Sequence, residues 1–319
     1  MAQDQLILAL DYGGTKLMAA TVGRGARQWL ALERSVSPPQ HDGDYERKTM
    51  HALAHKLLGG ARPAAVGISF GGPVDAGGRL VFLSHHIPGW ENIPYCDQVE
   101  AEFGAPAAMA NDGNIGALGE YVFGVGAGCR SLLYITVSTG VGGGWVFDGK
   151  IFAGADGMAG EIGHTTVDPR GPLCVCGRHG CVEALACGPK FAEVAQARLR
   201  AEPGAGAKLR ALAGGDIANV TGQLVAQAAA EGDALATEVL LEAARSLGIG
   251  IGTALNLINP ERVVVGGGVS KSGPAWWAAL RAAARATALP QARVEIVPAS
   301  LGDDAPLWGA VALAQALLK

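Results

Sequence analysis

Two stretches of this sequence share one pattern: a strand, a glycine turn and a second strand. LILALDYGGTKLMAATVG begins at Leu6 and LLYITVSTGVGGGWVFDG begins at Leu132, with Gly140 in the place of Gly14. Glycine tolerates positive φ and lets the backbone approach a ligand, and consecutive turn amides attract phosphate oxygens. One such hairpin would be a weak signal, because Gly-Gly turns are common without a ligand. Their repetition predicts an internal duplication in which each copy presents a phosphate-binding turn.

The loop over residues 161–183, EIGHTTVDPRGPLCVCGRHGCVE, concentrates soft metal ligands. One histidine and three cysteines lie within eighteen residues: His164, Cys174, Cys176 and Cys181. Zinc prefers tetrahedral nitrogen and sulfur coordination, and a closed set of four ligands is typical of a structural site. The alternatives are buried thiols without metal, or a disulfide pair. The spacing, with glycines and prolines that permit a tight non-helical path, favours a structural zinc ion.

The spacing inside this loop resembles a known signature. Residues 161–164 follow E-x-G-H and residues 174–183 follow C-x-C-G-x-x-G-C-x-E. This pair is similar to the motif of the ROK family, whose members are sugar kinases and sugar-responsive repressors. The resemblance extends over residues 6–318 and implies an α/β chain with a zinc-binding loop. The implied fold is the two-lobed actin-like ATPase fold, a duplicated ribonuclease H-like unit, which the two glycine turns also resemble.

The resemblance implies two lobes. An N-terminal lobe of residues 1–113 and 302–319 would hold the first phosphate hairpin and a wall of the sugar cleft. A C-terminal lobe of residues 114–301 would hold the second hairpin, the zinc loop and the adenosine site.

Local signals predict several helices. Asp44 can cap a helix over 45–58, and a helix beginning near Ile115 follows the short strand at 107–110. Apolar periodicity predicts further helices over 217–230 and 234–258.

The strand at 107–110 delivers Asn111 and Asp112 at its end. A carboxylate at a strand terminus is well placed to point into a cleft, although Asp112 could instead only cap the following helix. In the ROK family this pair supplies a sugar contact and the catalytic base, so the resemblance favours Asp112 as a base that also contacts the sugar. The other sugar contacts that it implies are Gly71, His86, Asn111, Glu161, His164 and Glu183.

The resemblance also implies ATP and Mg²⁺. Asp11 would orient Mg²⁺ through water, because this ion keeps most of its hydration shell. A third glycine run, after a strand at 262–265, would let adenosine lie against the backbone, although a plain strand-to-helix turn is the alternative. The implied nucleotide contacts are Asp11, Gly13, Gly14, Thr15, Lys16, Thr139, Gly140, Gly142, Gly266, Gly267 and Gly268.

Composition narrows the function classes. With 319 residues, 49% hydrophobic and 17% charged, the chain can bury a large core. A net charge of −4 without Lys/Arg clusters argues against nucleic acid and anionic membranes as partners. No apolar run approaches the ~20 residues that span a bilayer, so we expect a cytoplasmic protein. Cys96, Cys129 and Cys187 are expected to be reduced, buried thiols.

The resemblance to the ROK family, together with this composition, implies an ATP-dependent hexose kinase that acts on the 6-hydroxyl of a glucose-like sugar. Kinases for N-acetylglucosamine, N-acetylmannosamine or fructose are alternatives, as is polyphosphate as donor. A non-catalytic sugar-sensing ROK protein is another, although repressors of the family carry a helix-turn-helix before the first strand and only five residues precede Leu6. We expect a homodimer or homotetramer.

Overall fold

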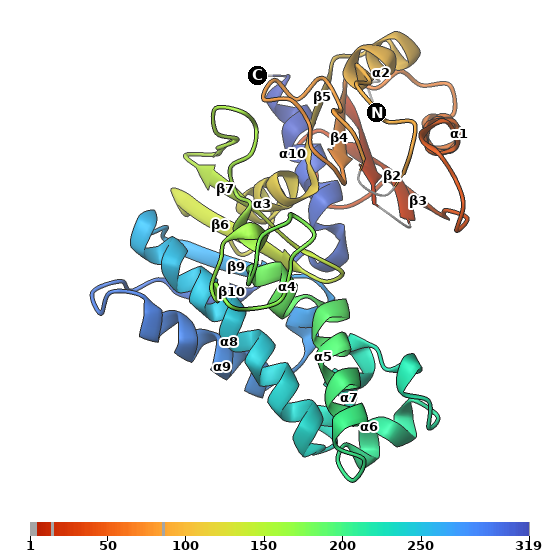
Figure 1. Cartoon of the computed structure of the whole chain (residues 1–319). Coiled ribbons are helices and arrows are strands. Elements are labelled where there is room, and N and C mark those ends of the chain that lie inside the picture. Colours follow the sequence, from red (N-terminus) through yellow and green to blue (C-terminus); the bar gives the residue numbers. More distant parts are fainter. Residues whose placement is uncertain (1–4, 14–15, 85–86, 319) are drawn as a thin grey trace. The chain divides into compact units, whose positions relative to one another are not determined.

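The computed structural model describes residues 5–13, 16–84 and 87–318 (Figure 1). Two five-stranded sheets form its framework, with strand orders β3-β2-β1-β4-β5 and β10-β9-β6-β7-β8. The first contains β1 (Leu6–Tyr12), β2 (Lys16–Gly23), β3 (Ala31–Val36), β4 (Ala65–Phe70) and β5 (Ala107–Asn111). The second contains β6 (Ser131–Val137), β7 (Val141–Phe147), β8 (Lys150–Ile151), β9 (Arg262–Gly266) and β10 (Glu295–Pro298).

The strand orders confirm the predicted duplication. In each sheet the first strand of a strand–turn–strand copy, β1 or β6, is central, with its hairpin partner on one side and a later strand on the other. β1 pairs antiparallel with β2 and parallel with β4, which pairs parallel with β5. In the second sheet β9 and β10 are likewise parallel.

Ten α-helices lie between the described strands or follow them. They are α1 (Gly43–Leu58), α2 (Tyr95–Phe103), α3 (Asp112–Val122), α4 (Val182–Ala186), α5 (Gly188–Ala201), α6 (Ala207–Leu212), α7 (Gly222–Ala230), α8 (Ala234–Leu257), α9 (Pro274–Thr287) and α10 (Ala305–Ala316). Among the described helices none is both long and apolar enough to cross a membrane.

Two compact units divide the chain. The first unit contains residues 1–134, 144–160 and 299–319, and the second contains 135–143 and 161–298. This division differs from the predicted lobes because α3 and the segment after it belong to the first unit. The physical reason is packing: Gly119 and Ile115 of α3 lie directly against the backbone of α10, at Ala305 and Gly309.

Three local predictions differ from the structure in their boundaries. The cap of α1 is Asp42, whose carboxylate accepts from Tyr45 N at 2.8 Å, so the predicted cap Asp44 lies in the first turn. α3 begins at Asp112 because Asn111 caps it. The helix predicted over 217–230 is split, because Thr221 accepts from Leu224 N and starts a new helix after a 3-10 turn. The three cysteines outside the zinc loop are free and buried, as expected.

The first sheet is covered on both faces. Alternate residues of β1 point to opposite sides, so that Leu8 and Leu10 pack with α1 and α2 while Ile7 and Ala9 pack with α10. α10 approaches the sheet so closely that a Cβ added to Gly67 would lie 1.8 Å from Ala310 O. Backbone contact of this kind leaves no room for any side chain.

Substitution of Gly67 should therefore test this packing. We expect Gly67→Ala to lower the free energy of unfolding by about 1–3 kcal/mol, because α10 must shift away from β4. Denaturant titration measures the change. Gly204→Ala is the control, because a Cβ there meets nothing within 4 Å, and it should change stability by less than about 0.5 kcal/mol. Equal stability of the two variants would contradict the packing argument.

Candidate functional site

The structure brings the four predicted zinc ligands together in the second unit. Nδ1 or Nε2 of His164 and the sulfurs of Cys174, Cys176 and Cys181 all lie within 4.8 Å of one another. His164 Nδ1 is 3.7 Å from Cys174 Sγ, and the sulfurs of Cys176 and Cys181 are 3.6 Å apart. Tetrahedral zinc with Zn–S bonds of ~2.3 Å requires ligand separations of about 3.7 Å. The four side chains therefore fit a four-coordinate zinc ion.

The backbone of the zinc loop explains how the ligands converge. Cys174 N donates to Arg178 O and Gly177 N donates to Cys174 O, which closes a tight turn between the cysteines. Gly180 has φ +65°, and a Cβ there would lie 1.5 Å from Asp168 O. Glycine is required at this position because both the conformation and the space exclude a side chain.

The loop also contacts the second glycine turn. Glu183, in the first turn of α4, accepts a hydrogen bond from Val141 N at 2.9 Å through Oε2. A Cβ on Gly140 would lie 2.7 Å from the same oxygen. Glu161 is exposed, and its carbonyl accepts from His164 N at the 3-10 turn Ile162–His164. One carboxylate oxygen of Glu183 is thus committed to the turn.

The first unit collects the predicted base and metal residues at one sheet edge. The parallel strands β1, β4 and β5 end in register, with Tyr12 opposite Phe70 and Phe70 opposite Asn111. Gly71 N donates to Tyr12 O at 3.0 Å, which ties the first two strand ends together. Carboxyl ends of parallel strands are the usual ligand edge of an α/β sheet.

Asn111 and Asp112 stand at this edge. Asn111 Nδ2 donates to Gly72 O at 3.2 Å, and its Oδ1 accepts from Gly113 N at 2.9 Å. Asp112 Oδ1 also accepts from Gly113 N, at 2.8 Å. Asn111 is therefore the helix cap and is fixed at both ends, while Asp112 occupies the first position of α3.

Asp11 lies on the central strand of the same edge and is buried. Burial, together with the nearby carboxylates of Asp112 and Asp304, raises the pKa of this carboxyl to about 7. A cation beside such a buried carboxyl group stabilises its ionised form. Gly13 N donates to Lys16 O at 3.0 Å and closes the turn. The predicted contacts Gly14, Thr15 and His86 lie outside the described residues.

An open pocket of about 830 Å³ in the second unit joins two of the predicted nucleotide turns. Thr139 of the second turn and Gly268 of the third both line it. Gly267 has φ +86°, and a Cβ there would lie 2.3 Å from Val137 O, so the third turn lies directly against β6. Gly142 and Gly266, in β7 and β9, do not line the pocket.

Sequence reasoning did not identify the other wall of this pocket. This wall consists of α5, the start of α7 and Lys271, which follows the third turn. Its polar residues include Glu193, Gln196, Thr221, Gln223 and Lys271. Gly188 N donates to Ser138 O at 2.8 Å and holds the start of α5 against the second turn. In the sequence, the Cys-Gly-Pro run at 187–189 could have indicated that a helix starts here.

Comparison with known proteins decides the family. A sequence model described as the ROK family matches residues 7–317. The chain belongs to the ROK family. A glucokinase of Halalkalibacterium halodurans is 35% identical to it, over 96% of this chain and 94% of that protein. An N-acetylmannosamine kinase of Salmonella typhimurium is 40% identical over 190 residues, which cover 59% of this chain and 64% of that kinase.

Among solved structures, a ROK glucokinase from Streptomyces griseus, in complex with glucose and AMPPNP, superposes on this ROK protein with a TM-score of 0.83. The two are 33% identical, over 98% of this chain and 99% of the glucokinase. These similarities class the chain as a sugar kinase of the ROK family, and they confirm the actin-like ATPase fold.

Metal analysis tests the zinc cluster. We expect the purified protein to hold about one zinc ion per chain, and Cys176→Ser to lose most of it, because a hydroxyl is a poor substitute for a thiolate. Elemental analysis measures the content. Cys129→Ala should keep the metal, since Cys129 lies outside the cluster. A metal-free wild-type protein would show that the four residues serve another purpose.

Proposed function

We propose that this protein is an ATP-dependent hexose kinase that phosphorylates the 6-hydroxyl of a glucose-like sugar. The observation that carries the proposal is the position of Asp112, at the carboxyl edge of β5 and near enough to the buried Asp11 for the two carboxylates to interact electrostatically. Similarity to glucokinases over nearly the whole chain supports it.

Asp112 acts as the general base. It accepts the proton of the attacking hydroxyl, a contribution of order 10²–10⁴ in rate for a positioned group. Asn111 stands beside it with both amide ends held by backbone groups. The sugar is therefore aligned by a fixed side chain, and alignment supplies much of the catalysis in phosphoryl transfer.

ATP would occupy the pocket between Thr139 and Gly268, with its phosphates at the second glycine turn. In the first unit, Asp11 lies near the end of β1, before the first glycine turn, and Lys16 begins the next strand. Asp11 would hold Mg²⁺ through water, since its carboxylate is a hard oxygen ligand. When bound, Mg²⁺ neutralises charge on the phosphates.

The zinc loop sets the sugar contacts of the second unit. His164 turns Nδ1 toward Cys174, so that Nε2 is left for a sugar hydroxyl and the ring plane would be fixed by the metal. Glu161 and Glu183 flank this histidine along the chain. Loss of zinc would consequently weaken sugar binding before ATP binding.

An N-acyl hexosamine kinase is the second candidate. The similarity to N-acetylmannosamine kinases favours it. Over the segment that this comparison covers, the sequence identity is higher than the identity to the glucokinase over nearly the whole chain. The homodimer or homotetramer and the cytoplasmic location stay predictions.

Replacement of Asp112 tests the proposed base. Asp112→Ala should abolish phosphorylation of glucose while sugar affinity stays within about tenfold of the wild type. A coupled assay of ADP release measures the first, and calorimetry measures the second. Asp112→Asn, which keeps the shape of the side chain, should behave alike. Near-normal turnover in either variant would defeat the assignment.

The nucleotide pocket is tested at Gly268. A Cβ there meets only Ser138 Oγ, at 3.6 Å, so Gly268→Val should fold normally. Its side chain narrows the pocket, and we expect KM for ATP to rise about tenfold or more, the equivalent of ~1.4 kcal/mol. Glucose affinity measured without ATP should not change. An unaltered KM for ATP would place the nucleotide elsewhere.

A further inference from the structure

In the first unit, the start of α1 binds three consecutive residues of another segment, 88–90. Gly43 N donates to Pro88 O at 2.7 Å, and Arg47 Nη1 donates to Gly89 O at 2.9 Å. The two backbones also lie in contact, because a Cβ added to Gly43 would be 2.6 Å from Gly89 O. The helix and this segment therefore hold one fixed arrangement.

The third contact joins two buried side chains. Trp90 Nε1 donates to Glu46 Oε2 at 2.7 Å. Trp90 has no exposed surface and Glu46 is 3% exposed. A hydrogen bond to a carboxylate is stronger than one between neutral groups, and leaving a buried partner unpaired costs free energy. This bond therefore fixes the indole ring relative to α1.

The second carboxylate oxygen of Glu46 is engaged as well. Its Oε1 is 3.1 Å from His41 Nε2, and the other ring nitrogen of His41 is 2.7 Å from Pro38 O. The side chains of His41 and Glu46 are both buried. Because both of its oxygens have partners, Glu46 is held in the orientation that binds Trp90.

The Trp90 ring packs against the ends of two strands of the first sheet. Its centroid is 5.3 Å from that of Tyr12 and 4.7 Å from that of Phe70, both in edge contact. Tyr12 ends β1 and directly follows Asp11. Phe70 ends β4 and directly precedes Gly71, a predicted sugar contact. The indole thus supports the edge at which the predicted site residues gather.

The segment bound by α1 also adjoins a second predicted sugar contact. Three residues separate Trp90 from His86, which lies outside the described residues. Ile87, the next residue after His86, is buried in the same hydrophobic core as Trp90. Because so short a chain limits the distance between its ends, the position of Trp90 restricts where this part of the sugar wall can lie.

We propose that Glu46 is a positioning residue for sugar binding. Through Trp90 it holds the residues after His86, and the end of β4 before Gly71, in the arrangement that receives a hexose. Being buried, Glu46 acts through the indole and does not contact the sugar. The inference rests on the proposed kinase function, in which His86 and Gly71 contact the sugar.

Sugar affinity tests this role independently of turnover. Glu46→Ala should raise the Kd for glucose, measured by calorimetry without ATP, about tenfold or more, because the buried bond to Trp90 is lost. KM for glucose should rise likewise, while kcat and KM for ATP stay within about threefold of the wild type. A residue that served stability alone would lower the denaturation midpoint without changing the Kd.

Glu46→Gln is the matched conservative variant. Its amide oxygen can accept from Trp90 Nε1, and its amide N–H can donate to Nε2 of a His41 ring protonated on Nδ1. Every buried group then keeps a partner, so the Kd for glucose should stay within about twofold of the wild type. A loss as large as that in Glu46→Ala would contradict the proposal, since the bond to Trp90 would not be what matters.

Trp90→Phe keeps an aromatic ring and removes the donor, and it provides the test if Glu46→Ala does not fold. We expect its Kd for glucose to rise about tenfold. The double variant Glu46→Ala/Trp90→Phe should bind no more weakly than the weaker single variant, to within about threefold, because both changes break the same bond. Additive losses would reject the path from Glu46 through Trp90.

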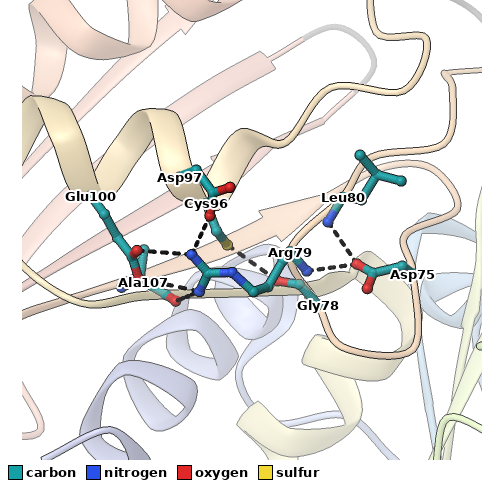
Figure 2. Close-up of polar contacts among 8 residues, drawn as sticks. All are labelled: Asp75, Gly78, Arg79, Leu80, Cys96, Asp97, Glu100 and Ala107. Atoms are coloured by element: carbon teal, nitrogen blue, oxygen red, sulfur yellow. Dashed lines mark hydrogen bonds and ion pairs between the residues drawn. The ribbon is translucent and has the colours of Figure 1, made fainter.

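Arg79 provides a control in another network of the first unit (Figure 2). Arg79 pairs with Asp97 and with Glu100 of α2, whose Oε2 is 2.8 Å from Arg79 Nη2. These ion pairs are partly exposed, so Arg79→Gln should cost little stability and leave the Kd for glucose within about twofold. An equal rise of the Kd in Arg79→Gln and Glu46→Ala would show that any loosening of this unit weakens sugar binding, and would overturn the specific role of Glu46.

The same measurements separate this inference from the kinase proposal. Phosphorylation of glucose with an unchanged Kd in Glu46→Ala and Trp90→Phe would overturn the inference alone. Binding of glucose without release of ADP would defeat the kinase proposal, and the Kd values of the variants would still decide the role of Glu46. A wild-type protein that binds no hexose would overturn both.

Discussion

Parallel pairing of β1, β4 and β5 is the constraint on which the first unit depends. Because Tyr12, Phe70 and Asn111 are aligned across the three strands, whatever follows each strand meets at one edge. The glycine turn, the Gly71 region and the Asn111-Asp112 pair are all consequences of this register. A slip of one residue would turn Asp11 to the other face of the sheet, and the buried carboxylate would leave the edge.

The direct contact of α10 with β4 makes this register possible. Gly67 has no side chain, so the helix rests on the strand itself and buries β1 and β4 from that side. α3 packs against the same helix, and Glu120 of α3 is completely buried. Its carboxylate accepts from Ser300 N at 2.8 Å and Leu301 N at 2.7 Å, which fixes the chain where it returns to the first unit. Fully satisfied buried charges of this kind hold one geometry.

In the second unit the loop of predicted zinc ligands, and not strand register, is connected to the phosphate-binding turn. The predicted zinc ligands lie in a single loop, and Glu183, two residues after Cys181, bonds to the glycine turn at Val141. The metal loop and the phosphate turn are therefore connected through one short helix. The stiffness of one would be transmitted to the other, which is how a structural metal could influence a sugar site without contacting phosphate.

Much of this arrangement is local in sequence. The four clustered His and Cys side chains, the duplicated strand–turn–strand units and the strand end at Asn111-Asp112 are each encoded within about twenty residues, so spacing and apolar period predicted their positions. The role of Asp112 as a base is implied by the resemblance to the ROK family and not by the local pattern. Helix starts were less certain, because Asp42 and Asp44 are both good caps and only the path of the chain selects one.

Tertiary structure alone decided the two pockets. The wall of the larger one comes from α5 and α7, whose residues carry no motif and meet the glycine turns only through packing. The smaller one, of about 180 Å³, depends on segment 74–78 lying along β5. Sequence determined which chemical groups the protein has and which local turns present them. Only the folded chain decided which distant backbones meet, because close packing joins surfaces that no short-range pattern records.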